Sequence, residues 1–142
     1  MFPDLQSVRI HGVPWRELIG YFRAERFWQN EFIPKVQQRG AQIISVRGSS
    51  SAASAANAAL AHTRDWVLGS PQCDWTSMAV LSQGEYGVPS GLVSSFPVLC
   101  NNGSWQIVNP SGAFTAFQQY YIEQSIKELE SERDMVSEML KF

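Results

Sequence analysis

The stretch SSFPVLCNNGSWQIV, residues 94–108, indicates two antiparallel strands joined by a tight turn. Asn102-Gly103 is the turn signal, because both residues tolerate the positive φ that a two-residue hairpin turn needs. A third strand is predicted from TSMAVL, residues 76–81, which precedes a loop rich in glycine and serine. Pro97 predicts a sheet edge or a bulge, since proline donates no ladder hydrogen bond. We therefore expect a sheet of three antiparallel strands.

Two helical segments are predicted before this sheet. Phe32, Ile33 and Val36 form an apolar stripe within residues 31–40, and Gly40 is a stop signal. The apolar run IISV, residues 43–46, predicts a short strand. An alanine-rich helix is then expected from residue 52 to about residue 68, with serine at its head as the N-cap. The sequence Gly-Ser-Pro at residues 69–71 ends it.

The two ends of the chain give different signals. Residues 1–30 are predicted to be irregular, with a short strand near residues 8–10 and a short helix carrying Trp15, Leu18 and Phe22. A marginally ordered N-terminal arm is the alternative. Residues 113–142 predict one long helix, because Ile122, Ile126, Leu129, Arg133, Val136 and Leu140 recur at helical spacing. We expect this helix to dock along the sheet, because the heptads are few for a two-stranded coiled coil.

Length and composition set limits on function. The chain has 142 residues, a formal net charge of −2 and 44% hydrophobic residues, which is typical of one soluble domain. The predicted helices and strands make it a single α+β domain over residues 1–142. The weak negative charge argues against nucleic-acid binding. No apolar run approaches the roughly 20 residues that cross a bilayer, so we expect no membrane partner. Cys73 and Cys100 are scattered, which favours a reducing compartment. A cytoplasmic location is expected.

The titratable residues do not form a catalytic set. His11 and His62 have no carboxylate or nucleophile beside them in the sequence, so a surface or packing role is favoured for both. The cysteines and histidines lack the spacing of a metal site. The serines at residues 49–51 precede the alanine-rich helix, where a carboxylate or phosphate could bind free N–H groups. An ordinary helix start gives the same pattern.

Several short motifs resemble one family, in order and over nearly the whole chain. They lie at residues 36–41, 50–56, 62–66, 77–82, 86–89 and 95–98, and the likeness resumes at Trp105 and the C-terminal helix. These segments resemble the C-terminal half of cytosolic-type NAD-dependent malate dehydrogenases, within the lactate/malate dehydrogenase family. The resemblance implies an antiparallel sheet covered by helices, with a long C-terminal helix. It also implies a substrate domain whose missing partner is an N-terminal Rossmann domain that binds NAD.

The resemblance further implies that catalytic groups lie outside this chain. In the family the catalytic histidine precedes a Tyr-Pro-Asp-like tripeptide, which Phe2-Pro3-Asp4 matches here. We therefore expect no catalytic residue in the chain, no NAD bound by it alone, and no activity without the Rossmann domain or an equivalent chain. Ser50 and Ser51 match the family's substrate-pocket serines. Gly48 and Ser49 depart from its usual residues, which puts the shape of the pocket in doubt.

Association is expected on two grounds. The alanine-rich helix resembles the family's homodimer contact, so a homo-oligomer is predicted through it. Loss of the Rossmann domain would expose apolar surface, with Trp15, Phe22, Phe27 and Trp28 as candidates. The alternatives are a non-catalytic binding or structural module within a larger assembly, and a split enzyme restored by a separate nucleotide-binding chain.

Overall fold

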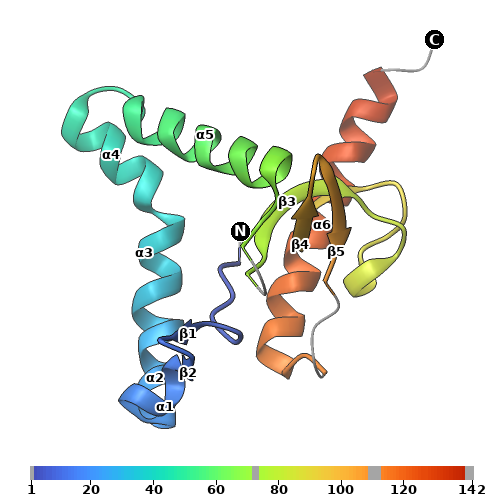
Figure 1. Ribbon diagram of the computed structural model, residues 1–142. Coiled ribbons are helices and arrows are strands. Elements are labelled where there is room, and N and C mark those ends of the chain that lie inside the picture. The colour runs from blue at the N-terminus through green and yellow to red at the C-terminus, as the bar shows by residue number, and fades with distance from the viewer. Residues whose placement is uncertain (1, 72–73, 109–112, 140–142) are drawn as a thin grey trace. The chain divides into compact units, whose positions relative to one another are not determined.

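The computed structural model describes residues 2–71, 74–108 and 113–139. The chain divides into two compact units, an N-terminal unit of residues 1–51 and a C-terminal unit of residues 52–142. Together their elements make an α+β fold with antiparallel sheets and a long C-terminal helix, as the sequence predicts (Figure 1).

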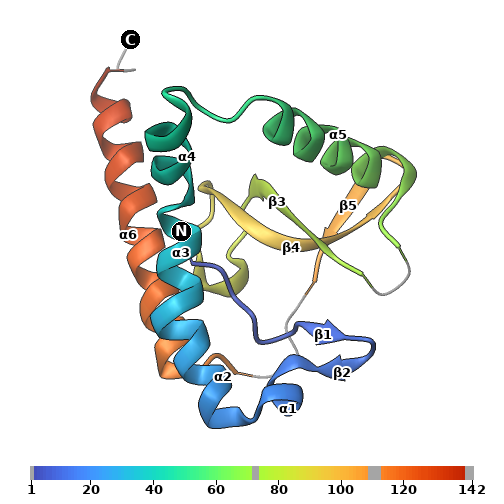
Figure 2. The ribbon, with the colours of Figure 1, turned by 90° about the vertical axis from the view of Figure 1, so that its left-hand side faces the viewer.

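The N-terminal unit is a small hairpin followed by a succession of helices. Strands β1 (Arg9–Ile10) and β2 (Val13–Pro14) pair antiparallel around a turn in which His11 and Gly12 both have positive φ. Five helical elements follow, stacked along one direction from α2 to α4 in both views (Figures 1 and 2). They are α1 (Trp15–Ile19), α2 (Tyr21–Phe27), the π-helical turn η1 (Trp28–Phe32), α3 (Ile33–Gln37) and α4 (Arg39–Arg47).

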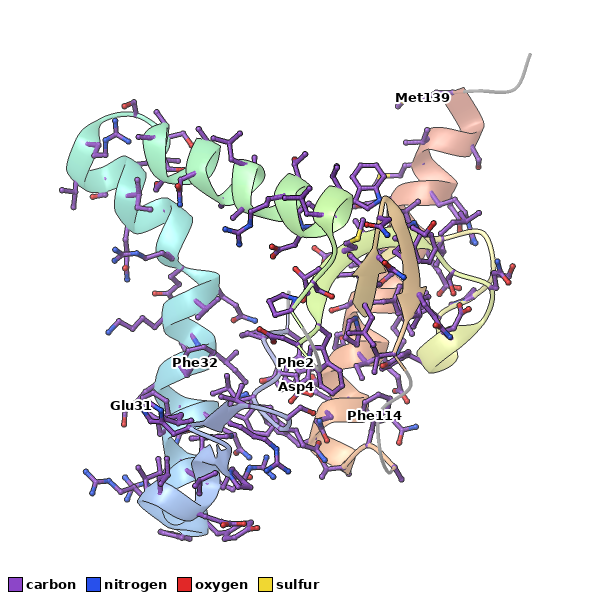
Figure 3. All side chains as sticks on the ribbon, in the orientation of Figure 1. Phe2, Asp4, Glu31, Phe32, Phe114 and Met139 are labelled. Carbon is purple, nitrogen blue, oxygen red and sulfur yellow. The ribbon has the colours of Figure 1, made fainter. Side chains whose placement is uncertain are left out.

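Two tryptophans hold the first residues of the chain onto this unit. The indole N–H of Trp28 donates to the carbonyl of Pro3 at 3.0 Å, and that of Trp15 donates to the carbonyl of Leu5 at 2.6 Å. Phe2 packs against the Trp28 ring, with the two centroids 5.9 Å apart (Figure 3). Because buried indole N–H groups need acceptors, these bonds fix residues 2–5 in place as well as satisfying the rings.

Three expectations for this unit are wrong. Trp15 and Trp28 are buried, so among the four aromatic residues expected at an exposed surface, Phe22 and Phe27 alone are exposed. The run IISV is part of α4, because four apolar residues suit a helix as well as a strand and the neighbouring residues are helical. Gly40 lies inside α4 with no positive φ, so the helical backbone continues past it.

The C-terminal unit contains α5 (Ala53–Leu68), a three-stranded sheet, the short 3₁₀ helix η2 (Glu85–Gly87) and α6 (Ala116–Met139). The strands β3 (Thr76–Leu81), β4 (Val93–Asn101) and β5 (Ser104–Ile107) pair antiparallel in the order β3-β4-β5. The predicted turn is confirmed, with φ of 48° at Asn102 and 82° at Gly103. Pro97 lies inside β4, the central strand, opposite Ser77 of β3 and one residue before β4 begins to pair with β5 at Val98, so β4 is an edge at Pro97 on its β5 side only.

One face of the sheet forms the core of this unit. Its buried residues are Met78, Val80, Val88, Leu92, Phe96, Val98 and Cys100. From α6, Ile126 and Leu129 pack against them, so the prediction that this helix docks along the sheet is confirmed. Thr115 and Gln118 cap the start of α6 by exchanging hydrogen bonds between backbone and side chains, and Gln118 is fully buried.

Candidate substrate-binding segment

Residues 47–51 begin at the last residue of α4 and include Ser50 and Ser51, the two serines that the sequence predicts to bind substrate. Helix α4 ends at Gly48, whose φ of 70° is left-handed and whose N–H donates to the carbonyl of Ile44 at 2.8 Å. Arg47 then reaches over this turn, and its Nη1 donates to the carbonyl of Ser50 at 3.1 Å. Ser50 is exposed and Ser51 is half-buried. The turn therefore presents the Ser50 side chain to solvent while its carbonyl is held by Arg47.

The expected serine cap of the alanine-rich helix is wrong. The N-cap of α5 is Ala52, and no side-chain hydrogen bond caps the helix. Helix α5 begins at Ala53, two residues after the last serine of the run, and the N-cap position is held by an alanine, whose side chain has no acceptor. Ser50 and Ser51 therefore remain available for other partners, and their assignment as substrate residues stays a prediction.

In the part of the chain that the structure describes, neither histidine forms a hydrogen bond or ion pair with a carboxylate. His11 lies in the exposed β1–β2 turn, and His62 is half-buried on α5. The neighbouring Arg64 pairs with Asp65 at 3.0 Å. Burial raises the pKa of the Cys100 thiol, which packs 3.7 Å from the sulfur of Met78, while Cys73 lies outside the described residues. Within the described ranges, no group of three or more metal-ligating side chains is present.

Hydrogen bonds between its own residues hold the glycine-rich loop between β3 and β4. The buried hydroxyl of Ser82 donates to the carbonyl of Val88 at 2.9 Å and accepts from the N–H of Gly84 at 3.0 Å. The Glu85 carboxylate accepts the N–H of Gln83 at 2.7 Å, and this bond lowers the pKa of Glu85. Tyr86 donates its hydroxyl proton to the carbonyl of Val108 and stacks near Phe114 (Figure 3). These hydrogen bonds indicate that the loop has a structural role.

The direction of the described strands bears on whether this chain could bind a dinucleotide. Dinucleotides bind at the carboxyl ends of parallel strands, where a glycine-rich turn leads into a helix. Here every described strand pair is antiparallel, and the glycine-rich loop connects strand to strand. The residues that the structure describes therefore do not fit an NAD site, and no chemical step through NAD follows from them.

The class of protein is now defined by its architecture, an α+β domain in which a long C-terminal helix packs on one face of an antiparallel sheet. The family model described as the lactate/malate dehydrogenase alpha/beta C-terminal domain matches residues 1–140. The chain belongs to this family, as the sequence motifs predict.

Individual relatives are similar over nearly the whole chain. A malate dehydrogenase of Rhodococcus jostii is 52% identical over 139 residues, which are 97% of this chain and 40% of that protein. The crystal structure of malate dehydrogenase from Naegleria fowleri is 44% identical with a TM-score of 0.85, over 98% of this chain and 41% of that one. Lactate dehydrogenase of Trichomonas vaginalis, in complex with NADH and oxamate, is 26% identical with a TM-score of 0.73, over 81% and 35%. The chain spans about two fifths of the length of the first two.

Two features of the segment went unrecognised in the sequence. The sequence does not predict the bond from Arg47 to the Ser50 carbonyl, although a basic residue in the last turn of a helix can bond carbonyls near the helix end. The N-cap position of Ala52 was missed because the run of serines made each of them a plausible cap. In the described part of the chain, no helix is long and apolar enough to cross a membrane.

Proposed function

We propose that this chain supplies the substrate-side domain of an NAD-dependent malate dehydrogenase and is inactive alone. The observation that carries the proposal is the 52% identity to the Rhodococcus malate dehydrogenase over almost all of this chain. In the proposal, NAD, the catalytic histidine and the substrate-clamping arginines come from a Rossmann domain on another polypeptide segment. The reaction is the interconversion of malate and oxaloacetate in the cytoplasm.

Ser50 and Ser51 are proposed to line the malate pocket. Their support is the family motif together with the local geometry, since Arg47 holds the Ser50 carbonyl and leaves the exposed side chain free to turn toward a ligand. Hydroxyl groups suit this position because they can donate to a substrate carboxylate or hydroxyl. Arg47 is in this scheme a positioning residue that acts through Ser50.

A homodimer through α5 is part of the same proposal. Helix α5 buries none of its residues within this chain, and alanines dominate its first turns. Small side chains let two helices approach closely, which favours a helix–helix contact between copies. Leu60 adds an exposed apolar side chain midway along α5.

The test is reconstitution of activity. The chain is mixed with the segment of the Rhodococcus malate dehydrogenase that precedes its region of similarity, and oxaloacetate-dependent oxidation of NADH is measured. We expect no activity from either part alone and activity from the mixture. Ser50→Ala or Ser51→Ala should lower the reconstituted activity by about tenfold, the effect of one lost hydrogen bond. Ser49→Ala is the matched control and should leave activity unchanged.

The outcomes separate the alternatives. Activity of the chain alone would contradict the proposal. A stable complex of the two parts that remains inactive would favour the non-catalytic module. Equal effects of Ser49→Ala and Ser50→Ala would contradict the proposal that Ser50 lines the malate pocket, but not the proposal that the chain is a substrate-side domain.

A further inference from the structure

Helix α2 presents an apolar and basic surface to solvent. Ala24 is its buried position, Trp28 at the start of η1 is buried on the same side, and the helical repeat places Phe22 and Arg26 on the opposite side. Phe22 is 80% exposed, which is unusual for a phenylalanine in a folded unit. Arg23 and Arg26 are exposed beside it. Helix α1, which contacts α2, adds the exposed side chains of Leu18 and Ile19. Tyr21 is exposed as well. We call the exposed residues of this surface the α2 face, and it consists of Leu18, Ile19, Tyr21, Phe22, Arg23 and Arg26.

The distal half of α6 presents a surface of the opposite charge. Beyond residue 130, every described side chain of α6 is exposed, and Met139 lies near the far end of the helix with 81% of its surface exposed (Figure 3). Intervals of three and four residues place acidic and apolar side chains on one side of the helix. We call this set the α6 stripe, and it consists of Glu128, Glu132, Met135, Val136 and Met139.

The two surfaces follow an uneven distribution of charge in the chain. Residues 1–51 contain seven Lys or Arg and four Asp or Glu, whereas residues 52–142 contain four and nine. The formal charges are therefore +3 and −5, which add to the −2 of the whole chain. Within the described ranges, none of the ion pairs involves the arginines of the α2 face or the glutamates of the α6 stripe.

We propose that the α2 face of one copy of this chain binds the α6 stripe of a second copy. Arg23 and Arg26, three residues apart, would face Glu128 and Glu132, four residues apart, since each pair lies on one side of its helix. Phe22 would pack on the methionine side chains of the stripe, because thioethers make favourable contacts with aromatic rings. Two α2 faces would instead bring arginine against arginine, so charge selects the acidic stripe as the partner.

The contact is reciprocal between two copies. Each copy carries one α2 face and one α6 stripe, so two copies offer each other both halves of the contact. Both surfaces are small, and interfaces of this size are weak and transient. The dimer is therefore expected to dissociate in the micromolar range. This inference does not depend on the proposed function, and it uses a surface distinct from α5.

Sedimentation velocity tests the proposal on the whole chain with Leu60→Glu present in every sample, so that a dimer through α5 does not contribute. Between about 1 and about 100 µM, the sedimentation coefficient should rise from that of a monomer toward that of a dimer. Salt should weaken the dimer, because exposed ion pairs are screened. The double variants Arg23→Glu/Arg26→Glu and Glu128→Lys/Glu132→Lys should each raise the Kd at least about tenfold. An equal mixture of the two double variants should dimerise again, because each supplies a reversed partner.

A matched control separates the specific contact from net charge. Lys35→Glu/Arg39→Glu changes the charge of the same unit equally at exposed positions outside the α2 face, and its Kd should match that of the unchanged chain. Circular dichroism verifies that every variant is folded. A monomer at all concentrations overturns the proposal. So does a dimer that survives both reversals, a control variant that dissociates equally, or a mixture of reversed variants that stays monomeric.

Discussion

The two units of this chain reach order by different means. In the N-terminal unit, a few large side chains do most of the packing, and two indole N–H groups hold residues 2–5 against the helices. The C-terminal unit distributes its core over aliphatic, aromatic and sulfur-containing side chains from two strands, a loop and a helix. A unit that depends on few side chains should fail at one substitution, whereas a distributed core should lose stability in smaller steps.

The largest effect is expected at Trp28, which is 1% exposed. Trp28→Ala should cost about 3–5 kcal/mol, because it leaves a large cavity and frees the carbonyl of Pro3. Hydrogen exchange should then show loss of protection in residues 1–51, with β3–β5 still protected. Phe22→Ala is the exposed control and should change stability by less than about 0.5 kcal/mol. Loss of protection in both units together would mean that they unfold as one.

The distributed core is tested at Val98, which is fully buried at the centre of the sheet. Val98→Ala should destabilise the C-terminal unit by about 2–3 kcal/mol, since the surrounding side chains close only part of the cavity. Urea denaturation followed by far-ultraviolet circular dichroism measures the change. A cost as large as that of Trp28→Ala would remove the contrast between the two units.

A smaller effect is expected where α5 meets the sheet. Gly69 has φ of 97°, and an added Cβ would lie 3.3 Å from the backbone carbonyl oxygen of Cys100. Gly69→Ala should therefore cost about 1–2 kcal/mol, from backbone strain and the displaced strand. The midpoint of urea denaturation should fall accordingly. An unchanged midpoint would show that the backbone at residue 69 accommodates a Cβ without loss of stability.

The smallest effect is expected at Gly40, and it has the opposite sign. Gly40 lies within α4, and nothing is within 4 Å of an added Cβ. Gly40→Ala should stabilise the N-terminal unit by about 0.5–1 kcal/mol, because alanine loses less backbone entropy in a helix. Thermal unfolding of the variant should occur at a higher temperature. A lower one would mean that residue 40 needs glycine after all.

Elements whose signal is local could be predicted from the sequence. Asn102-Gly103 specifies its own turn, and that turn sets the register in which Cys100 pairs with Trp105. The spacing of Ile126 and Leu129 likewise predicts both the helix and the face that packs on the sheet. Thr115 and Gln118 carry a capping-box pattern that could have placed the start of α6 more closely than residue 113.

Elements decided by surroundings could not be predicted. The run at residues 43–46 is helical because its neighbours are, which four residues cannot reveal. Burial of Trp15 and Trp28 depends on carbonyls that lie 10 and 25 residues away along the chain. For the candidate site, Ser50 and Ser51 came from the family motif, and their role remains a prediction. The bond from Arg47 that fixes the Ser50 carbonyl became visible in three dimensions.

The placement of the tryptophans makes the chain report on its own unfolding. Trp15 and Trp28 are buried in the N-terminal unit, while Trp66, Trp75 and Trp105 of the C-terminal unit are each about 40% exposed. Buried indoles emit at shorter wavelength and are shielded from soluble quenchers such as acrylamide. Emission at shorter wavelength therefore comes from the N-terminal unit, and emission at longer wavelength, which acrylamide quenches, comes from the C-terminal unit. A single fluorescence titration can follow the two units separately, without any added label.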